Sequence, residues 1–175
     1  TSLEAKAAIV YDLTTGQTLY AKNADAQLPL ASLTKLLTVY AAIQNISSET
    51  PITISKHATD IEDSYALSAG DTLSFHDLAR ITLTASLNDG AGAIAEAVAT
   101  QTQLSETVLL ASAVSSLDLA QTYAVNGSGL DITTAVSGGY GSAYDLARLA
   151  GALAKKAPDI AEATTHEVTT ATSKN

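Results

Sequence analysis

Cysteine is absent from the 175 residues, which excludes disulfides and thiolate metal sites and leaves the redox compartment open. No apolar run is long enough to cross a bilayer, and no charged segment followed by an apolar one opens the chain. The mature or cloned form of an exported protein has the same appearance. The missing leader therefore does not indicate a cytoplasmic location.

Positive charge is also scarce, because 9 Lys and Arg stand against 18 Asp and Glu and the net charge is −9. The chain has no Lys/Arg stripe, and we expect no nucleic-acid partner, since neutralising phosphates requires clustered cations. His57, His76 and His166 are far apart and form no H-E-x-x-H pattern, so no metal site and no cofactor are predicted. A G-x-S-x-G elbow, which would support a Ser-His-Asp triad, is missing too.

The composition is that of a globular protein, with 46% hydrophobic and 15% charged residues. Much of the apolar content is alanine, with one Phe and no Trp, and this predicts tightly packed helices with small contact residues. The length is that of one domain, so we interpret residues 1–175 as a single domain with one substantial core.

The order of the local patterns predicts an α+β fold with its helices in the middle. An apolar run at 7–11, turn residues and an alternating segment at 17–20 predict a β-hairpin. Capping boxes of the form S-x-x-D open helices at Ser74 and Ser142, and Ser105 caps another helix. The other predicted elements are a helix from Ser32 to about Asn45, a short strand at 52–54, a small-residue helix at 90–98, glycine-rich loops at 126–131 and 137–141, and the beginning of a strand at 167–172.

The first candidate chemistry lies at the start of the helix in the stretch Pro29–Tyr40. Ser32 and Lys35 are three residues apart, so a helix brings their side chains to neighbouring points of one surface. A hydroxyl beside an amine at a helix N-terminus can form an activated serine nucleophile. S-x-x-K alone carries little weight, because Ser32 could simply be an N-cap and Lys35 a solvated residue.

A second pattern is the S-x-N triplet Ser86-Leu87-Asn88, which joins two predicted helices and is followed by Asp89 and a helix of small residues. The triplet recurs at 173–175, where we interpret it as a chance match. Asp60, Glu62 and Asp63 form an acidic cluster, which we interpret as a solvated face because no second signal of acid–base chemistry lies near it.

With P-L-A-S-L-T-K-L-L-T, S-L-N-D-G-A, N-G-S-G-L-D and S-A-Y-D-L-A-R-L-A in this order, the chain resembles the penicillin-binding serine D-alanyl-D-alanine carboxypeptidases from about residue 7 to 163. The resemblance implies a β-lactamase/transpeptidase-like fold, with an N-terminal β-hairpin, a mainly helical region and truncated C-terminal sheet strands. It also implies roles: Ser32 as nucleophile, Lys35 as general base, Ser86 as proton relay and Asn88 as the residue orienting Lys35 and the substrate amide. The implied partners are peptidoglycan stem peptides ending in D-Ala-D-Ala, and β-lactams.

Two departures from the family pattern stand out. Leu87 occupies the middle of the S-x-N triplet, where the family has glycine, and it could narrow the cleft or pack behind it. No K-T-G or K-S-G triplet occurs in the 175 residues. In the family that triplet lines the cleft and supplies the second oxyanion donor, whose loss costs about 10²–10³ in rate.

Three explanations of the missing triplet stay open: a fragment of a longer protein, strands supplied by another chain, or a shortened homologue that binds without turnover. We expect the first, with the domain incomplete at its C-terminus and any membrane association provided by segments outside this chain. The predicted function is a serine D-Ala-D-Ala carboxypeptidase of the bacterial cell envelope, outside the cytoplasm. The alternatives are a non-catalytic homologue that only binds these ligands and, third, a β-lactamase.

Overall fold

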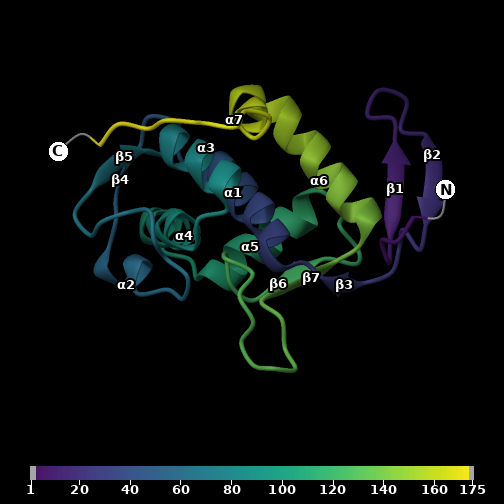
Figure 1. Ribbon diagram of the computed structural model, residues 1–175, viewed down its shortest axis with the longest axis horizontal. Helices are drawn as coiled ribbons and strands as arrows, with labels where there is room; N and C mark the ends of the chain where they lie inside the picture. Colours follow the sequence, from purple (N-terminus) through teal and green to yellow (C-terminus); the bar gives the residue numbers. More distant parts are fainter. Residues whose placement is uncertain (1–2, 174–175) are drawn as a thin grey trace.

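The computed structural model describes residues 3–173. Of the second S-x-N triplet, Lys174 and Asn175 lie outside the described residues. Helices occupy the centre of the molecule, a β-hairpin lies at one end, and the C-terminal segment runs along the opposite end (Figure 1). The α+β class is confirmed: seven helices and a short 3₁₀ turn alternate with three small sheets in the described part of the chain.

Helix α1, Thr34–Asn45, is the centre of the core because it is buried on several sides. Val39 and Ala42 belong to a core cluster shared with α3 (Phe75–Ala85) and α4 (Asn88–Thr102). Leu37 and Tyr40 belong to a second cluster shared with α5 (Glu106–Ser116) and α6 (Ala143–Lys156). A helix that is apolar nearly all round is stable only when other elements cover it. The first residues of α1 are thereby fixed in the middle of the fold.

The predicted serine caps are confirmed at three helices. Ser74 Oγ accepts the Asp77 N–H of α3 at 3.1 Å, and Ser142 Oγ accepts the Asp145 N–H of α6 at 3.1 Å. Ser105 Oγ accepts the Val108 N–H of α5 at 3.4 Å. Each cap satisfies a backbone donor that the helix itself leaves unpaired. Two short helices, α2 (Lys56–Thr59) and α7 (Pro158–Ala163), complete the helical part.

The predicted hairpin is confirmed as β1, Ala8–Tyr11, paired antiparallel with β2, Thr18–Lys22. Asp12 organises the turn by accepting the Thr14 N–H at 2.8 Å through its side chain. The hairpin packs on α6, where the Tyr11 and Tyr144 rings meet edge to face with centroids 5.7 Å apart.

The remaining strands agree less well with the sequence predictions. The strand expected at 52–54 is present as β4, Pro51–Thr53, and pairs with β5, Thr72–Ser74. The prediction of a plain loop at 137–141 is wrong, because Gly139–Gly141 form β7 between β3 (Leu28–Pro29) and β6 (Tyr123–Ala124). The glycines allow β7 to pass close to the first turn of α1: a Cβ on Gly139 would stand 2.4 Å from Thr34 Oγ1. Such a strand is determined by tertiary contacts and not by strand propensity.

The prediction of a strand beginning at 167–172 is also wrong. Residues 167–173 are irregular and run beside β5, where Ser173 Oγ accepts the Thr72 N–H at 3.4 Å. This segment is held by side-chain contacts and not by a ladder of backbone hydrogen bonds.

Candidate active site

Ser32 lies in a tight turn at the entrance to α1. Ala31–Leu33 form the 3₁₀ turn η1, which leads directly into the helix. Ala31 has a φ of +47°, the left-handed region that residues other than glycine seldom adopt and that is common at functional sites. Ser32 is exposed, and the helix-capping positions are Leu30 and Leu33, neither with a side-chain cap. The interpretation of Ser32 as a simple N-cap is therefore wrong.

Lys35 is buried directly beneath Ser32. Its side chain is 1% exposed, which excludes the alternative of a solvated surface lysine. The Lys35 ammonium nitrogen Nζ donates to Ser32 Oγ at 2.8 Å and to the backbone carbonyl of Ser128 at 3.0 Å. Burial lowers the pKa of Lys35, because the charged form loses its hydration. An amine with a lowered pKa, in contact with a serine hydroxyl, can accept the hydroxyl proton.

Ser86 lines the same cavity as Ser32 and Lys35. It ends α3 with a φ of +58°, and the cavity has a volume of about 490 Å³. Thr82 and Thr164 also line this cavity. The neighbouring Leu87 is 2% exposed and is not among the residues that line the cavity, so its side chain does not narrow it. The structure thus brings three of the four predicted residues together.

Asn88 is placed differently from the prediction. It is buried at the first turn of α4, and its side-chain amide donates to the Glu62 carbonyl at 2.9 Å. Among the described contacts of Lys35 there is no bond to Asn88, so the predicted contact between these two side chains is not formed. The adjacent Asp89 accepts the backbone N–H groups of Ala66 and Leu67 at 3.1 and 3.0 Å. Both side chains attach the S-x-N segment to residues 62–67.

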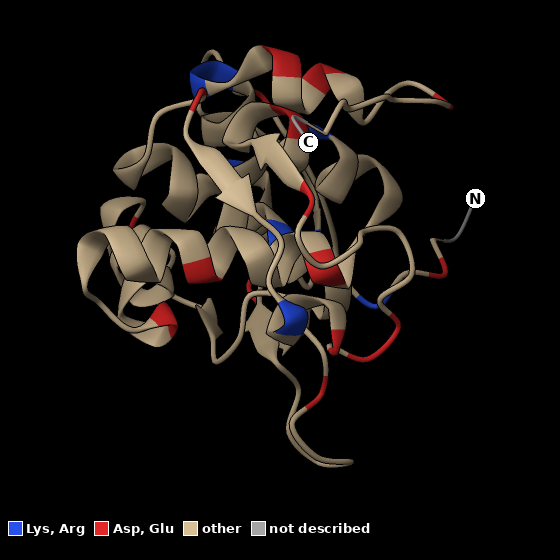
Figure 2. Cartoon of the chain, turned by 90° about the vertical axis from the view of Figure 1, so that its left-hand side faces the viewer, with Lys and Arg blue, Asp and Glu red and all other residues tan. Residues whose placement is uncertain are grey.

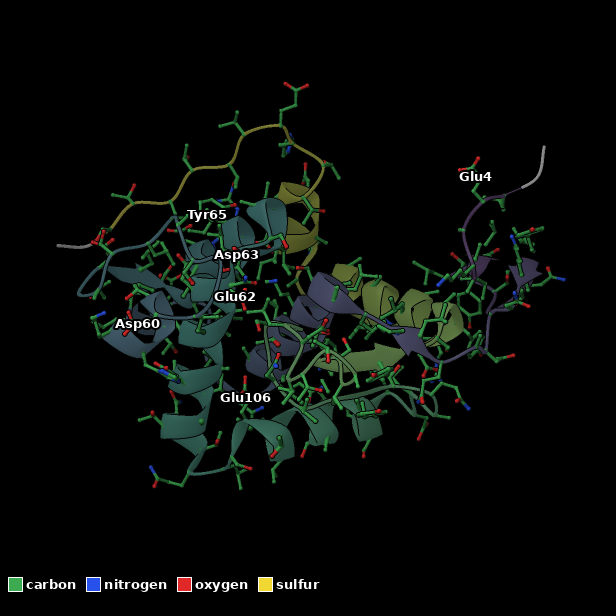
Figure 3. All side chains as sticks on the ribbon, turned by 60° about the horizontal axis from the view of Figure 1, so that its bottom comes forward. Glu4, Asp60, Glu62, Asp63, Tyr65 and Glu106 are labelled. Atoms are coloured by element: carbon green, nitrogen blue, oxygen red, sulfur yellow. The ribbon has the colours of Figure 1, made fainter. Side chains whose placement is uncertain are left out.

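The acidic cluster lies on the outside of that attachment. Asp60, Glu62 and Asp63 are exposed, as the sequence predicted, and follow one another on a single loop (Figure 3). Tyr65, 73% exposed, donates from its hydroxyl to the Ala85 carbonyl at 3.2 Å, next to Ser86. The cluster therefore forms the solvated surface of the loop that holds the S-x-N segment.

The contribution of Ser128 could not be predicted from the sequence. Its carbonyl belongs to residues 126–130, which we call the glycine loop, and 93 residues separate it from Lys35. Every residue type supplies a carbonyl, so no sequence pattern identifies this acceptor. Gly129 shows why the loop contains glycine: it has a φ of +80°, and a Cβ there would stand 1.9 Å from the Ala31 carbonyl oxygen. The loop thus lies directly against the turn that carries Ser32.

Charged residues are spread thinly over the molecule. Lys and Arg appear as isolated segments in Figure 2, with the more numerous acidic segments between them. Within residues 3–173, no group of three or more His, Asp or Glu side chains could hold a metal ion. None of the helices in the described part of the chain is sufficiently long and apolar for a bilayer crossing.

Comparison with known proteins identifies the family. A family model described as D-alanyl-D-alanine carboxypeptidase, peptidase S11, matches residues 1–175. The chain belongs to this family. It is 34% identical over 170 residues to the D-alanyl-D-alanine carboxypeptidase DacD of Salmonella typhimurium, covering 90% of this chain and 42% of that protein.

Solved structures of the family show the same fold. DacD from Francisella tularensis is 29% identical, with a TM-score of 0.82 over 94% of this chain and 40% of that chain. Penicillin-binding protein D2 from Listeria monocytogenes, in a cefotaxime-bound form, is 27% identical, with a TM-score of 0.78 over 97% of this chain and 70% of that chain. The chain spans less than half the length of the curated relatives it matches. The β-lactamase/transpeptidase-like fold expected from the sequence is confirmed.

Proposed function

We propose that this chain carries the acylation half of a serine-type D-Ala-D-Ala carboxypeptidase site acting on peptidoglycan stem peptides. The observation that carries the proposal is the 2.8 Å hydrogen bond from the buried Lys35 amine to Ser32 Oγ at the opening of a cavity. Membership of the family supports the same chemistry, and the cefotaxime-bound relative supports β-lactams as a second class of ligand.

In the proposed reaction, neutral Lys35 takes the proton of Ser32 as Oγ attacks the carbonyl of the terminal D-Ala-D-Ala peptide bond. The tetrahedral intermediate collapses when the leaving amine of the terminal D-alanine receives a proton, relayed by Ser86. The product is an ester on Ser32, which water then hydrolyses. Ser86 has the access that this role needs, because it lines the same cavity as Ser32 and Lys35. Asn88 acts in this scheme by holding the S-x-N segment in place through Glu62.

The protein would act in the bacterial cell envelope, outside the cytoplasm, since its family consists of cell-wall carboxypeptidases. The chain covers 42% of the Salmonella relative, and its 175 residues contain no K-T-G triplet. A second oxyanion donor and a site for the substrate carboxylate are therefore not supplied by that motif in this chain.

Intact-mass measurement after incubation with a penicillin tests the proposal. We expect an increase in mass equal to one penicillin, located on Ser32 by peptide mapping and lost in Ser32→Ala. Lys35→Arg should strongly slow the formation of the adduct, because a guanidinium keeps its proton and cannot accept that of Ser32. No adduct at high drug concentration would favour a homologue that only binds, and catalytic turnover of the drug would favour a β-lactamase.

A further inference from the structure

The glycine loop is bonded to both α5 and α1 through Gly127. The Gly127 N–H donates to Glu106 Oε1 at 2.7 Å, and the Gly127 carbonyl accepts from Thr38 Oγ1 of α1 at 2.8 Å. The next carbonyl along the chain, that of Ser128, is the acceptor of the Lys35 amine. One residue before the contact with Lys35, the backbone is therefore fixed at both its N–H and its C=O.

The other polar side-chain contacts of the loop are internal. Asn126 Oδ1 accepts the Gly129 N–H at 2.7 Å and the Ser128 hydroxyl at 3.2 Å, and its Nδ2 donates to the Leu130 carbonyl at 2.9 Å. These bonds determine the shape of the loop. They do not determine where the Ser128 carbonyl lies relative to α1, which depends on bonds to other elements such as those of Glu106 and Thr38.

Glu106 makes its bond in a setting that is unfavourable for a carboxylate. It is partly buried in the wall of a second cavity of about 330 Å³, which His57 of α2 and Glu96 of α4 also line. Burial raises the pKa of Glu106, the Gly127 N–H lowers it, and the charges of Glu96 and His57 act in opposite directions. Glu106 lies on a different element from the exposed acidic cluster (Figure 3). A partly desolvated carboxylate that accepts a backbone N–H forms a strong, directional bond.

We propose that Glu106 is a positioning residue for acyl transfer: through Gly127 it holds the Ser128 carbonyl, which in turn aims the Lys35 amine at Ser32. This proposal rests on the proposed function for its effect on rate. The geometry it describes is independent of activity. If the loop moves away, the Lys35 amine loses an acceptor and becomes accessible to water.

NMR titration of the Lys35 Cε resonance in the 175-residue chain tests the positioning directly. In Glu106→Ala the pKa of Lys35 should rise toward the ordinary lysine value, because a displaced loop hydrates the amine. In Glu106→Gln it should stay lowered, since the amide oxygen still accepts the Gly127 N–H. Acylation by a fluorescent penicillin should be slower by about 10- to 100-fold in Glu106→Ala and recover in Glu106→Gln, because misplacement by about 1 Å costs up to 10² in rate.

Ser105→Ala is the matched control, because it removes the N-cap of the same helix without touching the loop. It should leave the Lys35 titration as in the wild type. Thr38→Val removes the other bond to Gly127 at nearly constant volume and should shift the titration in the same direction as Glu106→Ala. An unchanged Lys35 titration in both loop variants, or an equal shift in Ser105→Ala, would overturn the proposal. A wild-type chain that penicillin does not acylate would refute the proposed function alone, and the titrations would still decide the role of Glu106.

Discussion

Gly129→Ala should destabilise the fold and displace Ser32 at the same time. A non-glycine residue in the left-handed region costs about 1–2 kcal/mol. The new Cβ would also stand 1.9 Å from the Ala31 carbonyl oxygen and 2.8 Å from Thr34 Oγ1. Relieving that overlap requires a backbone shift of about 1 Å, and overpacking of this kind costs about 1–3 kcal/mol. The sum is about 2–5 kcal/mol, or a decrease in Tm of about 4–20 °C for a chain of this length.

Gly70→Ala separates the two contributions. Gly70 has a φ of +96°, but a Cβ there would meet no heavy atom within 4 Å, so only the cost of the conformation applies. Urea denaturation of the wild type and both variants gives the two free energies of unfolding. We expect Gly129→Ala to lose about 1–3 kcal/mol more than Gly70→Ala. The labelling of Ser32 by a fluorescent penicillin should fall in Gly129→Ala and not in Gly70→Ala. Equal losses of stability would refute the close contact between the glycine loop and the Ser32 turn.

Three other predictions concern a close backbone contact, a buried amine and an exposed ion pair. Gly139→Ala should lower the free energy of unfolding by about 1–3 kcal/mol through its overlap with Thr34 Oγ1. Adding Thr34→Ala should restore part of that loss, and additive effects of the two substitutions in a double-mutant cycle would contradict this explanation. Lys35→Met should unfold at higher urea concentration than the wild type at pH 7, and this difference should shrink toward pH 10. Above the lowered pKa of Lys35 the unfolded wild type binds a proton that the folded wild type does not, so the stability of the wild type rises with pH. A difference independent of pH would count against the desolvated amine. Burial raises the pKa of Asp159, but hydrogen bonds from His76 and the backbone outweigh it, so the net pKa is lowered and the stabilisation is lost as the pH falls through that value. Asp159→Asn should therefore cost at most about 1 kcal/mol near neutral pH and nothing in strong acid, measured by thermal scans.

The elements that the sequence predicted correctly are those whose signals are local. The hairpin is encoded by turn chemistry around Asp12, and the starts of α3, α5 and α6 by a serine side chain that reaches a backbone N–H a few residues away. Ser32 and Lys35 belong to the same category, because a spacing of three residues on a helical turn already places their side chains near each other.

The parts that the sequence did not predict depend on contacts between distant segments. Strand β7 exists because glycines let it approach Thr34, and the acceptor of the Lys35 amine is a backbone carbonyl that any residue could supply. The family resemblance predicted a contact between Asn88 and Lys35, but the Asn88 amide donates instead to the Glu62 carbonyl. The positioning role proposed for Glu106 has no local sequence signal, since a glutamate in the first turn of a helix is ordinary helix chemistry.

The long-range contacts also explain how the chain maintains an unfavourable site. Ala31 and Ser86 flank the cavity in left-handed conformations, each costing about 1–3 kcal/mol, and Lys35 is buried with a lowered pKa. Such a combination persists only where the surroundings determine it from several sides. Here the core on both sides of α1 fixes the helix, residues 62–67 fix the S-x-N segment, and the glycine loop closes against the Ser32 turn. Substitutions in these supporting segments should therefore affect the pairing of Ser32 with Lys35 even though they touch neither side chain.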